Sequence, residues 1–149
     1  MPFIARWPGS IKPGTTSKAL VCFTDVMATL ADLVGAKLPA GAGEDSISFL
    51  PVLLGTKPET PPRDTIVHPA GIFAIRSGKW KLIAGLGSGG FSKPRRRKPA
   101  PGEPAGQLYD LEADLGETKN LYAQKPDVVE RLTKLLGEQR KAGRSAPRR

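Results

Sequence analysis

Apolar side chains recur at the three- and four-residue spacing of an amphipathic helix in two segments of the chain. In residues 23–35 these positions are Val26, Met27, Leu30, Leu33 and Val34. In residues 125–143 they are Val128, Val129, Leu132, Leu135 and Leu136. We expect the first helix to be capped by Thr24 and to end at Gly35, because a hydroxyl suits a helix start and Gly suits its end. The second helix is expected to open at Pro126, since Pro is favoured in the first turn.

Shorter apolar segments with strand character lie outside these helices. Ser77 and Gly78 form a two-residue link that predicts a β-hairpin, because Gly tolerates a positive φ. In the second arm of this hairpin Trp80 and Leu82 point to one face and their neighbours to the other, so we expect one buried and one largely wet face. The expected strands are residues 2–7, 65–67, 73–76, 79–83 and 107–111.

The length and composition of the chain permit one ordinary domain with many loops. The sequence has 149 residues, 39% of them hydrophobic, which is enough for a real core. It also contains 17 Gly and 15 Pro, which favours loops around that core. Three prolines between residues 58 and 62 predict a domain or subdomain boundary near residues 56–64. The basic residues after Gly143, in 144–149, are expected to be disordered.

The formal net charge of +9 is concentrated in two places. Residues 93–98 carry five basic side chains and residues 140–149 carry five more, and the remaining 13 basic and 14 acidic residues nearly balance. The segment 92–106 has no apolar periodicity and is expected to be a solvated basic loop. An alternative is a free-standing basic module that binds nucleic acid or a sulfated polysaccharide. Nucleic acid is the less favoured ligand, because no aromatic platform or known nucleic-acid module accompanies the charge.

Neither a membrane partner nor a targeting segment is expected. No run approaches the 18 apolar residues of a membrane span, and the first residues lack the charged-then-apolar layout of a signal peptide. Cys22 is the single cysteine, so it cannot form an internal disulfide and leaves the cellular compartment open. Without a signal in the sequence, localisation stays unknown.

His68 is the only histidine, which excludes a pair of histidine metal ligands. It follows a strand-like stretch and precedes Pro69, a position from which side chains reach a cleft. Arg76, Lys79 and Lys81 could contact an anion, but on the exposed face of a hairpin they are expected to be solvated charges.

The polar segment 107–126 joins the last strand to the last helix. Its alternating acids could be mistaken for a calcium loop, but Leu115 and Gly116 interrupt them and no Glu closes a twelve-residue loop. We expect the acids and Asn120 instead to accept hydrogen bonds from backbone N–H groups in turns, while leucines anchor the segment to the core. The acids are Asp110, Glu112, Asp114 and Glu117, and the leucines are Leu108, Leu111 and Leu121.

Four segments, taken together and in this order, resemble the sulfatase family. LYDLEADLGETKNL, residues 108–121, resembles the signature near the end of that family, with Leu115 where the family usually has Pro. FAIRSGKWKLI resembles the hairpin of its small C-terminal subdomain. PFIARWPGSIKPGTTS resembles the segment after the family's Gly-Gly-x-R stretch, and FTDVMATLADLVG resembles the helix that follows it.

The resemblance implies an α/β fold of the alkaline-phosphatase-like type, of which this chain holds only the end. Residues 1–56 would complete the large domain, and residues 57–143 would form the small C-terminal subdomain, an antiparallel sheet with a packed C-terminal helix. The implied activity is arylsulfatase-like hydrolysis of sulfuric esters. In the family the nucleophile is a formylglycine made from the Cys or Ser of a C/S-x-P-x-R motif, beside a calcium ion.

No catalytic or metal-binding residue of that family can be assigned here. Cys22 is followed by Phe23 and Thr24, where the modification motif requires Pro two residues on, so it is interpreted as a structural residue. The chain is therefore expected to lack the formylglycine and metal-site motifs, to bind no cofactor and to be inactive alone. Its expected partners are a sulfate ester in an intact enzyme, contacted near His68, and a missing N-terminal half or a partner chain. A fragment of a related phosphoester hydrolase remains an alternative.

Overall fold

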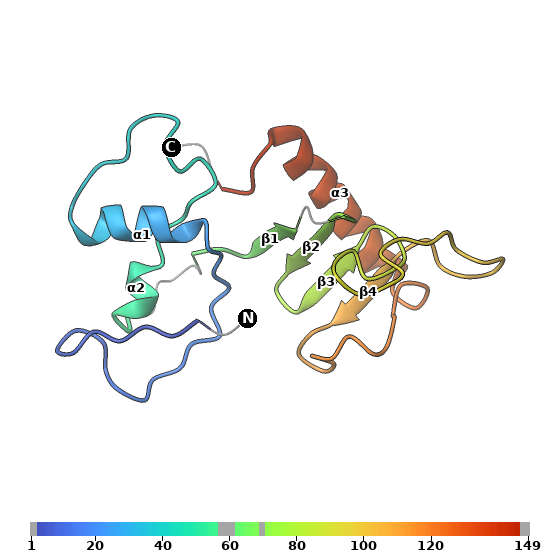
Figure 1. Cartoon of the computed structure of the whole chain (residues 1–149), viewed down its shortest axis with the longest axis horizontal. Helices are drawn as coiled ribbons and strands as arrows, with labels where there is room; N and C mark the ends of the chain where they lie inside the picture. Colours follow the sequence, from blue (N-terminus) through green and yellow to red (C-terminus); the bar gives the residue numbers. More distant parts are fainter. Residues whose placement is uncertain (1–2, 57–61, 69–70, 147–149) are drawn as a thin grey trace. The chain divides into compact units, whose positions relative to one another are not determined.

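The computed structural model describes residues 3–56, 62–68 and 71–146, and they form two compact units (Figure 1). Of the described residues, unit 1 contains 3–56, 62–63 and 146, and unit 2 contains 64–68 and 71–145. The division after Arg63 falls inside the region 56–64 in which a boundary is expected. The assignment of residues 1–56 and 57–143 to two parts of a larger enzyme stays a prediction.

Unit 1 is built on α1 (Asp25–Leu33) and the short α2 (Leu50–Leu53). The first helix forms where its apolar spacing predicts it, and Gly35 follows it with a φ of +67°. The expected Thr24 cap is wrong: Thr24 already has helical angles, φ −58° and ψ −26°, and its side chain makes no capping bond. The carboxylate of Asp25 accepts the Cys22 N–H instead, at 2.8 Å.

The strand expected at residues 2–7 does not form in the described part, residues 3–7. A strand needs a partner for its backbone groups, and here the Trp7 carbonyl instead accepts the N–H groups of Ser10 and Ile11 in a turn. The ring of Phe3 packs edge-on against Phe49, with 5.5 Å between ring centroids. The segment is thus anchored to α2 by a side chain.

Unit 2 contains a four-stranded antiparallel sheet in the order β1-β2-β3-β4. The hairpin prediction is confirmed, but Ser77 pairs with Trp80, so the link is Gly78 and Lys79, one residue later than expected. Gly78 occupies the left-handed region with a φ of +55°. The strands are β1 (Thr65–His68), β2 (Ala74–Ser77), β3 (Trp80–Ile83) and β4 (Gln107–Asp110).

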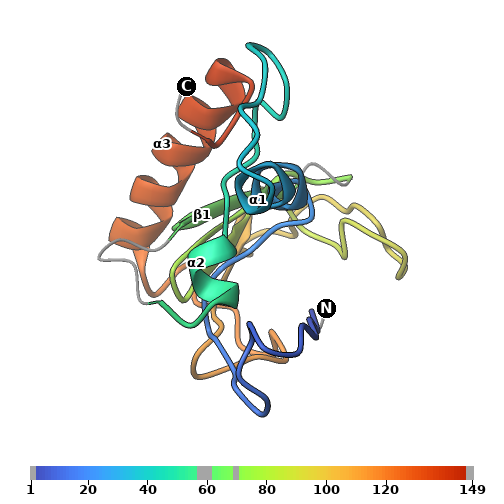
Figure 2. The ribbon, with the colours of Figure 1, turned by 90° about the vertical axis from the view of Figure 1, so that its left-hand side faces the viewer.

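The helix α3 (Pro126–Ala142) covers one face of this sheet (Figure 2). The inner stripe of the helix is confirmed, since three of its five predicted residues are buried and the other two pack against them. Gly143 ends the helix with a φ of +73°. The buried core consists of Ile75, Leu82 and Leu108 from the sheet and Val128, Leu132 and Leu136 from the helix.

The opposite face of the sheet is less wet than expected. Ala74, Ile83 and Tyr109 form a second buried cluster, with Ile72 and Leu111 packed against it. Alternation along β3 places Ile83 on this face, and the flanking residues 72 and 111 then shield it. The expected mixed architecture, an antiparallel sheet with a packed C-terminal helix, is confirmed.

Acids of the connector accept backbone hydrogen bonds, as predicted. Asp114 Oδ2 accepts the N–H groups of Thr118 and Lys119, at 2.7 and 2.8 Å. Asn120 Oδ1 accepts the N–H groups of Leu108 and Tyr122, both at 3.0 Å, and so ties the connector to β4. These bonds hold the polar segment between the last strand and the last helix.

The C-terminal residues are described as far as Ala146, which is buried in unit 1. Its N–H donates to Asp45 Oδ1 at 2.6 Å. Residues 147–149 lie outside the described part, so disorder of the tail 144–149 stays a prediction for them. Within the described ranges, no helix has the length and apolar character needed to cross a membrane.

Candidate functional site

Several reactive side chains share the face of the sheet opposite α3. Residues paired across antiparallel strands point to the same side, and the register pairs Arg76 with Lys81 and Lys81 with Tyr109. Ile66 of β1 pairs with Arg76, and His68 lies two residues further along the same strand. His68 therefore points to this face, at the end of β1. The register therefore assembles an imidazole, a guanidinium, an ammonium and a phenol on one surface of unit 2.

The lysines of the hairpin form ion pairs, which adds to their expected description as solvated charges, since the Lys79 side chain is still 41% exposed. Lys81 Nζ lies 2.6 Å from Glu117 Oε1, and Lys79 Nζ lies 2.7 Å from Asp110 Oδ2. Arg76 Nε donates to the Gly78 carbonyl at 3.1 Å. The connector acids reach back to the hairpin, a long-range contact that spacing along the chain does not reveal.

The environment of His68 favours its neutral form. The side chain is exposed, yet loss of part of its hydration lowers the pKa of His68 below the ordinary value of 6.5. The positive charges of Lys81 and Arg76 lower this pKa further, and Glu117 opposes them. Neutral imidazole can accept a hydrogen bond or a proton.

The titration of His68 gives a direct check of this geometry. We expect its ring signals in NMR to titrate below pH 6.5, and Lys81→Met to raise the midpoint because one facing charge is removed. Lys134→Met, on the exposed side of α3, is the matched control and should leave it unchanged. Unit 2 should lose stability as pH falls from 6.5 toward the folded-state pKa, because the unfolded chain binds the proton first. A midpoint at or above 6.5 contradicts this geometry.

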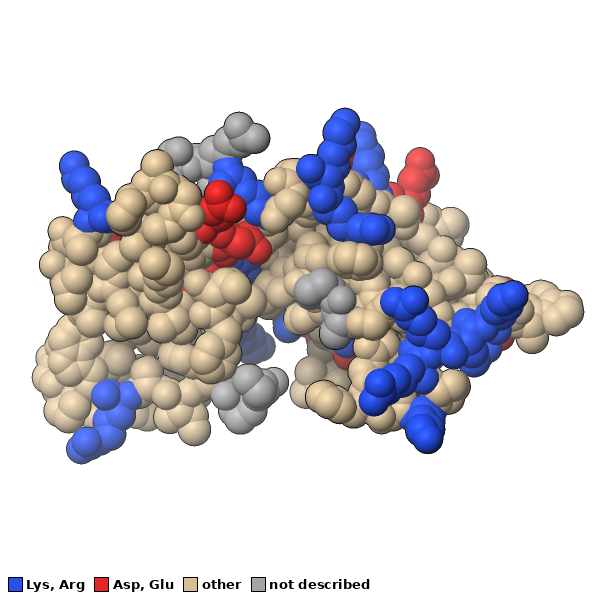
Figure 3. Space-filling view, turned by 45° about the horizontal axis from the view of Figure 1, so that its top comes forward, with Lys and Arg blue, Asp and Glu red and all other residues tan. Residues whose placement is uncertain are grey.

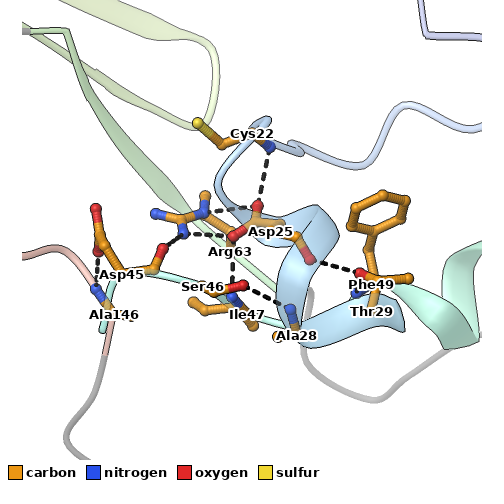
Figure 4. A network of polar contacts seen from close by, with 10 residues as sticks. All are labelled: Cys22, Asp25, Ala28, Thr29, Asp45, Ser46, Ile47, Phe49, Arg63 and Ala146. Atoms are coloured by element: carbon orange, nitrogen blue, oxygen red, sulfur yellow. Dashed lines mark hydrogen bonds and ion pairs between the residues drawn. The ribbon is translucent and has the colours of Figure 1, made fainter. Parts of the chain in front are cut away.

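A buried ion pair forms the polar centre of unit 1 (Figure 4). Arg63 Nη2 lies 2.6 Å from Asp25 Oδ1, and Arg63 Nε donates to Asp25 Oδ2 at 3.1 Å. The two residues are only 4% and 1% exposed. This bidentate arrangement is the strong form of the guanidinium-carboxylate pair.

The pair gathers backbone groups from distant segments. Asp25 also accepts the N–H groups of Cys22 and Ile47, at 2.8 and 2.9 Å, while Arg63 Nη2 donates to the Asp45 carbonyl at 2.8 Å. Burial disfavours the guanidinium charge, but the hydrogen bond and charge of Asp25, with Asp45 adding, leave the pKa of Arg63 raised. The carboxylate is occupied by these partners, so its role is to fix the entry of α1. Sequence analysis missed Arg63, because 38 residues separate the two charges.

Cys22 is a half-buried free thiol beside this network, and its backbone binds Asp25. The expectation that the chain lacks the C/S-x-P-x-R pattern is wrong, because two serine-led segments satisfy it. These are Ser92-Lys93-Pro94-Arg95-Arg96 and residues 145–149, SAPRR, of which 147–149 lie outside the described part. Ser92 lies on an exposed loop. A five-residue pattern recurs readily by chance in a chain with 23 basic and 15 Pro residues.

The described residues do not gather metal ligands. Across residues 3–56, 62–68 and 71–146, no group of three His, Cys, Asp or Glu side chains could hold a metal ion. The connector acids do not fit a calcium ion, since Asp110 and Glu117 pair with lysines and Asp114 accepts backbone N–H groups.

Similar proteins are named sulfatases, and this chain matches only part of each. An N-acetylgalactosamine-6-O-sulfatase of Bacteroides thetaiotaomicron is 36% identical over 91% of this chain and 26% of its own length. An ulvan-active sulfatase of Formosa agariphila is 33% identical over 91% and 31%. Human arylsulfatase A is 32% identical over 90% and 29%. The chain thus spans about a third or less of these relatives. Comparison with models of known protein families gives no match.

Solved structures give the same result for the fold. A structure from work on the metabolism of multiple glycosaminoglycans by Bacteroides thetaiotaomicron has a TM-score of 0.73 and 36% identity, covering 92% of this chain and 28% of that one. A protein in complex with its substrate D-glucosamine-2-N,6-O-disulfate has a TM-score of 0.64 and 26% identity, covering 91% and 27%.

Proposed function

Because this chain belongs to the sulfatase family, we propose that it forms the C-terminal part of an arylsulfatase-like sulfuric ester hydrolase and supplies scaffold to it. The main support for this proposal is the share of each chain that aligns. A relative that is 36% identical matches 91% of this chain, but the match spans only 26% of the relative's own length. In the remaining part of such an enzyme, the formylglycine and calcium that the family implies would supply the nucleophile and the charge stabilisation. The residues here position that part and shape its rim.

An apolar surface on unit 1 supports the proposal that another part of a sulfatase packs against this unit. Alongside its buried residues, α1 presents Met27, Leu30 and Leu33 at helical spacing, and Leu30 is 54% exposed. Phe23 and Val34 extend this surface at the two ends of the helix, and both are exposed. A cluster of large apolar side chains of this kind marks an interaction site. Because the chain matches only part of each relative, we expect the rest of a sulfatase domain to cover this apolar surface.

A chimera tests the proposed function. The region of the Bacteroides thetaiotaomicron relative that matches this chain is replaced by the chain itself, and hydrolysis of p-nitrocatechol sulfate is measured. We expect the chimera to be active, and both the truncated relative and this chain alone to be inactive. Leu30→Asp should abolish activity of the chimera, because it places a charge in the covered surface.

The same substitution separates a docking role from a local folding role. In the isolated chain Leu30→Asp should leave the far-UV circular dichroism unchanged, since Leu30 is exposed there. Lys37→Asp, an exposed position beyond the end of α1, is the control and should preserve activity of the chimera. Sulfatase activity of the purified chain alone, retained through successive purification steps, would contradict the proposal.

For His68 we propose a place at the rim of the substrate site. Its support is the neutral imidazole at the end of β1, next to the positive charges of Arg76 and Lys81. The charge of Lys81 is paired with Glu117, whereas Arg76 forms no ion pair among the described residues and can attract a sulfate. The neutral imidazole can share a hydrogen bond with a sugar hydroxyl. In the chimera, His68→Phe would raise KM more than it lowers kcat if His68 contacts bound substrate.

A further inference from the structure

We propose that unit 2 carries a binding surface for a sulfated polysaccharide, formed by the basic loop 93–98 together with Arg140 of α3. The inference rests on the proposed function for the choice of ligand, and on the geometry of unit 2 for the site. We call this surface the arginine surface. Its residues are Lys93, Arg95, Arg96, Lys98 and Arg140.

A cavity of about 270 Å³ borders the arginine surface, because Arg96 and Arg140 are among the residues that line it. Its floor comes from the residues just before β2 and just after β3, and arginines from the loop and from α3 complete its wall. The guanidinium carbon of Arg140 lies 4.1 Å from the centroid of the Phe73 ring, which holds this cation at the cavity. The apolar floor is formed by Ile72, Phe73, Ala84 and Leu86, and the wall includes Arg96, Arg97 and Arg140.

Backbone hydrogen bonds hold the basic loop in place. Arg97 N–H donates to the Leu86 carbonyl at 3.0 Å, and the carbonyls of Pro94 and Arg95 accept the N–H groups of Ser88 and Gly89, also at 3.0 Å. The exposed loop is therefore organised, which refines its expected description as a solvated segment. Because its backbone is ordered before a ligand binds, less conformational entropy is lost on binding.

The charge of the arginine surface is only partly balanced. Arg97 forms an ion pair with Glu103, and the hydrogen bond from Arg97 is the main cause that lowers the pKa of Glu103 to about 2. This pair stays charged and serves to fold the loop. In the part of the chain that the structure describes, none of the five residues of the arginine surface forms an ion pair with a carboxylate. Figure 3 shows Lys and Arg side chains gathered over part of the surface seen in this view.

Sulfated polysaccharide fits this surface better than other polyanions. A guanidinium offers two parallel N–H groups to a sulfate, and three of the five cations are arginines. Single strands of nucleic acid also need aromatic platforms, but Arg140 already covers one face of Phe73, and only one exposed aromatic side chain, Phe91, lies beside the loop. One such ring can pack on the apolar face of a pyranose.

The arginine surface lies at the same end of the sheet as His68. The register pairs His68 with Ala74 and Ala74 with Ile83, and the cavity is lined by the next residues outward, Phe73 and Ala84. A polysaccharide held on the arginine surface therefore has a short path to the proposed rim. Repeated sulfate groups would be retained there while one of them is presented to the enzyme.

The binding test uses the whole 149-residue chain and fluorescein-labelled chondroitin sulfate. Fluorescence anisotropy is measured over a series of salt concentrations. We expect Arg95→Ala with Arg96→Ala to weaken binding at least about tenfold and to reduce the slope of log K against log salt by roughly two, one for each lost charge. The matched control is Arg131→Ala with Lys134→Ala on the exposed side of α3, which should change affinity by less than about twofold.

Two results would overturn the proposal. One is an equal loss in both double variants, which would mean that total charge and not the arginine surface sets the affinity. The other is single-stranded DNA of matched charge that binds as tightly as chondroitin sulfate, which would assign the surface to nucleic acid. Either result leaves the activity of the chimera unaffected, so failure of this inference and failure of the proposed function are distinguishable.

Discussion

Replacing Arg63 by Met is expected to unfold unit 1. The substitution keeps an apolar stem of similar length but leaves the carboxylate of Asp25, 1% exposed, without its cation. Breaking a buried pair by removing one partner costs about 3–5 kcal/mol. Among the described residues of unit 1, only Ala28, Phe49 and Ala146 are buried and apolar, so a loss of this size exceeds what its core can compensate.

The Trp7 fluorescence in a Trp80→Phe background reports on unit 1 alone. We expect Arg63→Met to abolish the cooperative urea unfolding transition of unit 1 that Trp7 reports. Lys37→Met, at an exposed position, is the control and should preserve this transition. Asp25→Leu combined with Arg63→Leu should recover only part of the stability, because the N–H groups of Cys22 and Ile47 lose their acceptor. Equal midpoints for Arg63→Met and Lys37→Met would show that the pair does not hold unit 1 together.

The elements of unit 2 could be predicted because their signals are local. A hairpin needs only two alternating arms and a Gly between them, and α3 needs only its apolar stripe, so both follow from a few neighbouring residues. The one-residue shift of the turn to Gly78 and Lys79 arises from pairing of Ser77 with Trp80. Strand register depends on the partner strand, which a single arm does not encode.

The site could be predicted less well because its contacts are remote in sequence. Lys81 and Glu117 are 36 positions apart, and Arg63 and Asp25 are 38 positions apart. No periodicity links residues at such separations, whereas the fold brings them within hydrogen-bonding distance. The strand expected at residues 2–7 does not form in its described part, residues 3–7, for a related reason. A strand pairs with the edge of a sheet, and the described residues provide no such edge for this segment.

Leu132→Ala is expected to destabilise unit 2 by about 2–5 kcal/mol, the usual range for a fully buried Leu. Leu132 is 0% exposed and lies in α3 against the central strands of the sheet. Loss of its side chain leaves a cavity between Ile75, Leu82 and the helix, which rigid β-strands cannot fill by moving.

Trp80, which packs against this core, is the reporter in a Trp7→Phe background. Urea unfolding followed by its fluorescence should show a lower midpoint for Leu132→Ala with an unchanged slope, since the surface exposed on unfolding stays similar. Thr133→Ala, one residue away on the exposed side of α3, is the control and should shift the midpoint little. If both variants unfold at the same urea concentration, α3 does not cover the sheet in solution. In that case the sheet face opposite α3, with His68 and Lys81, would lose the support that positions it.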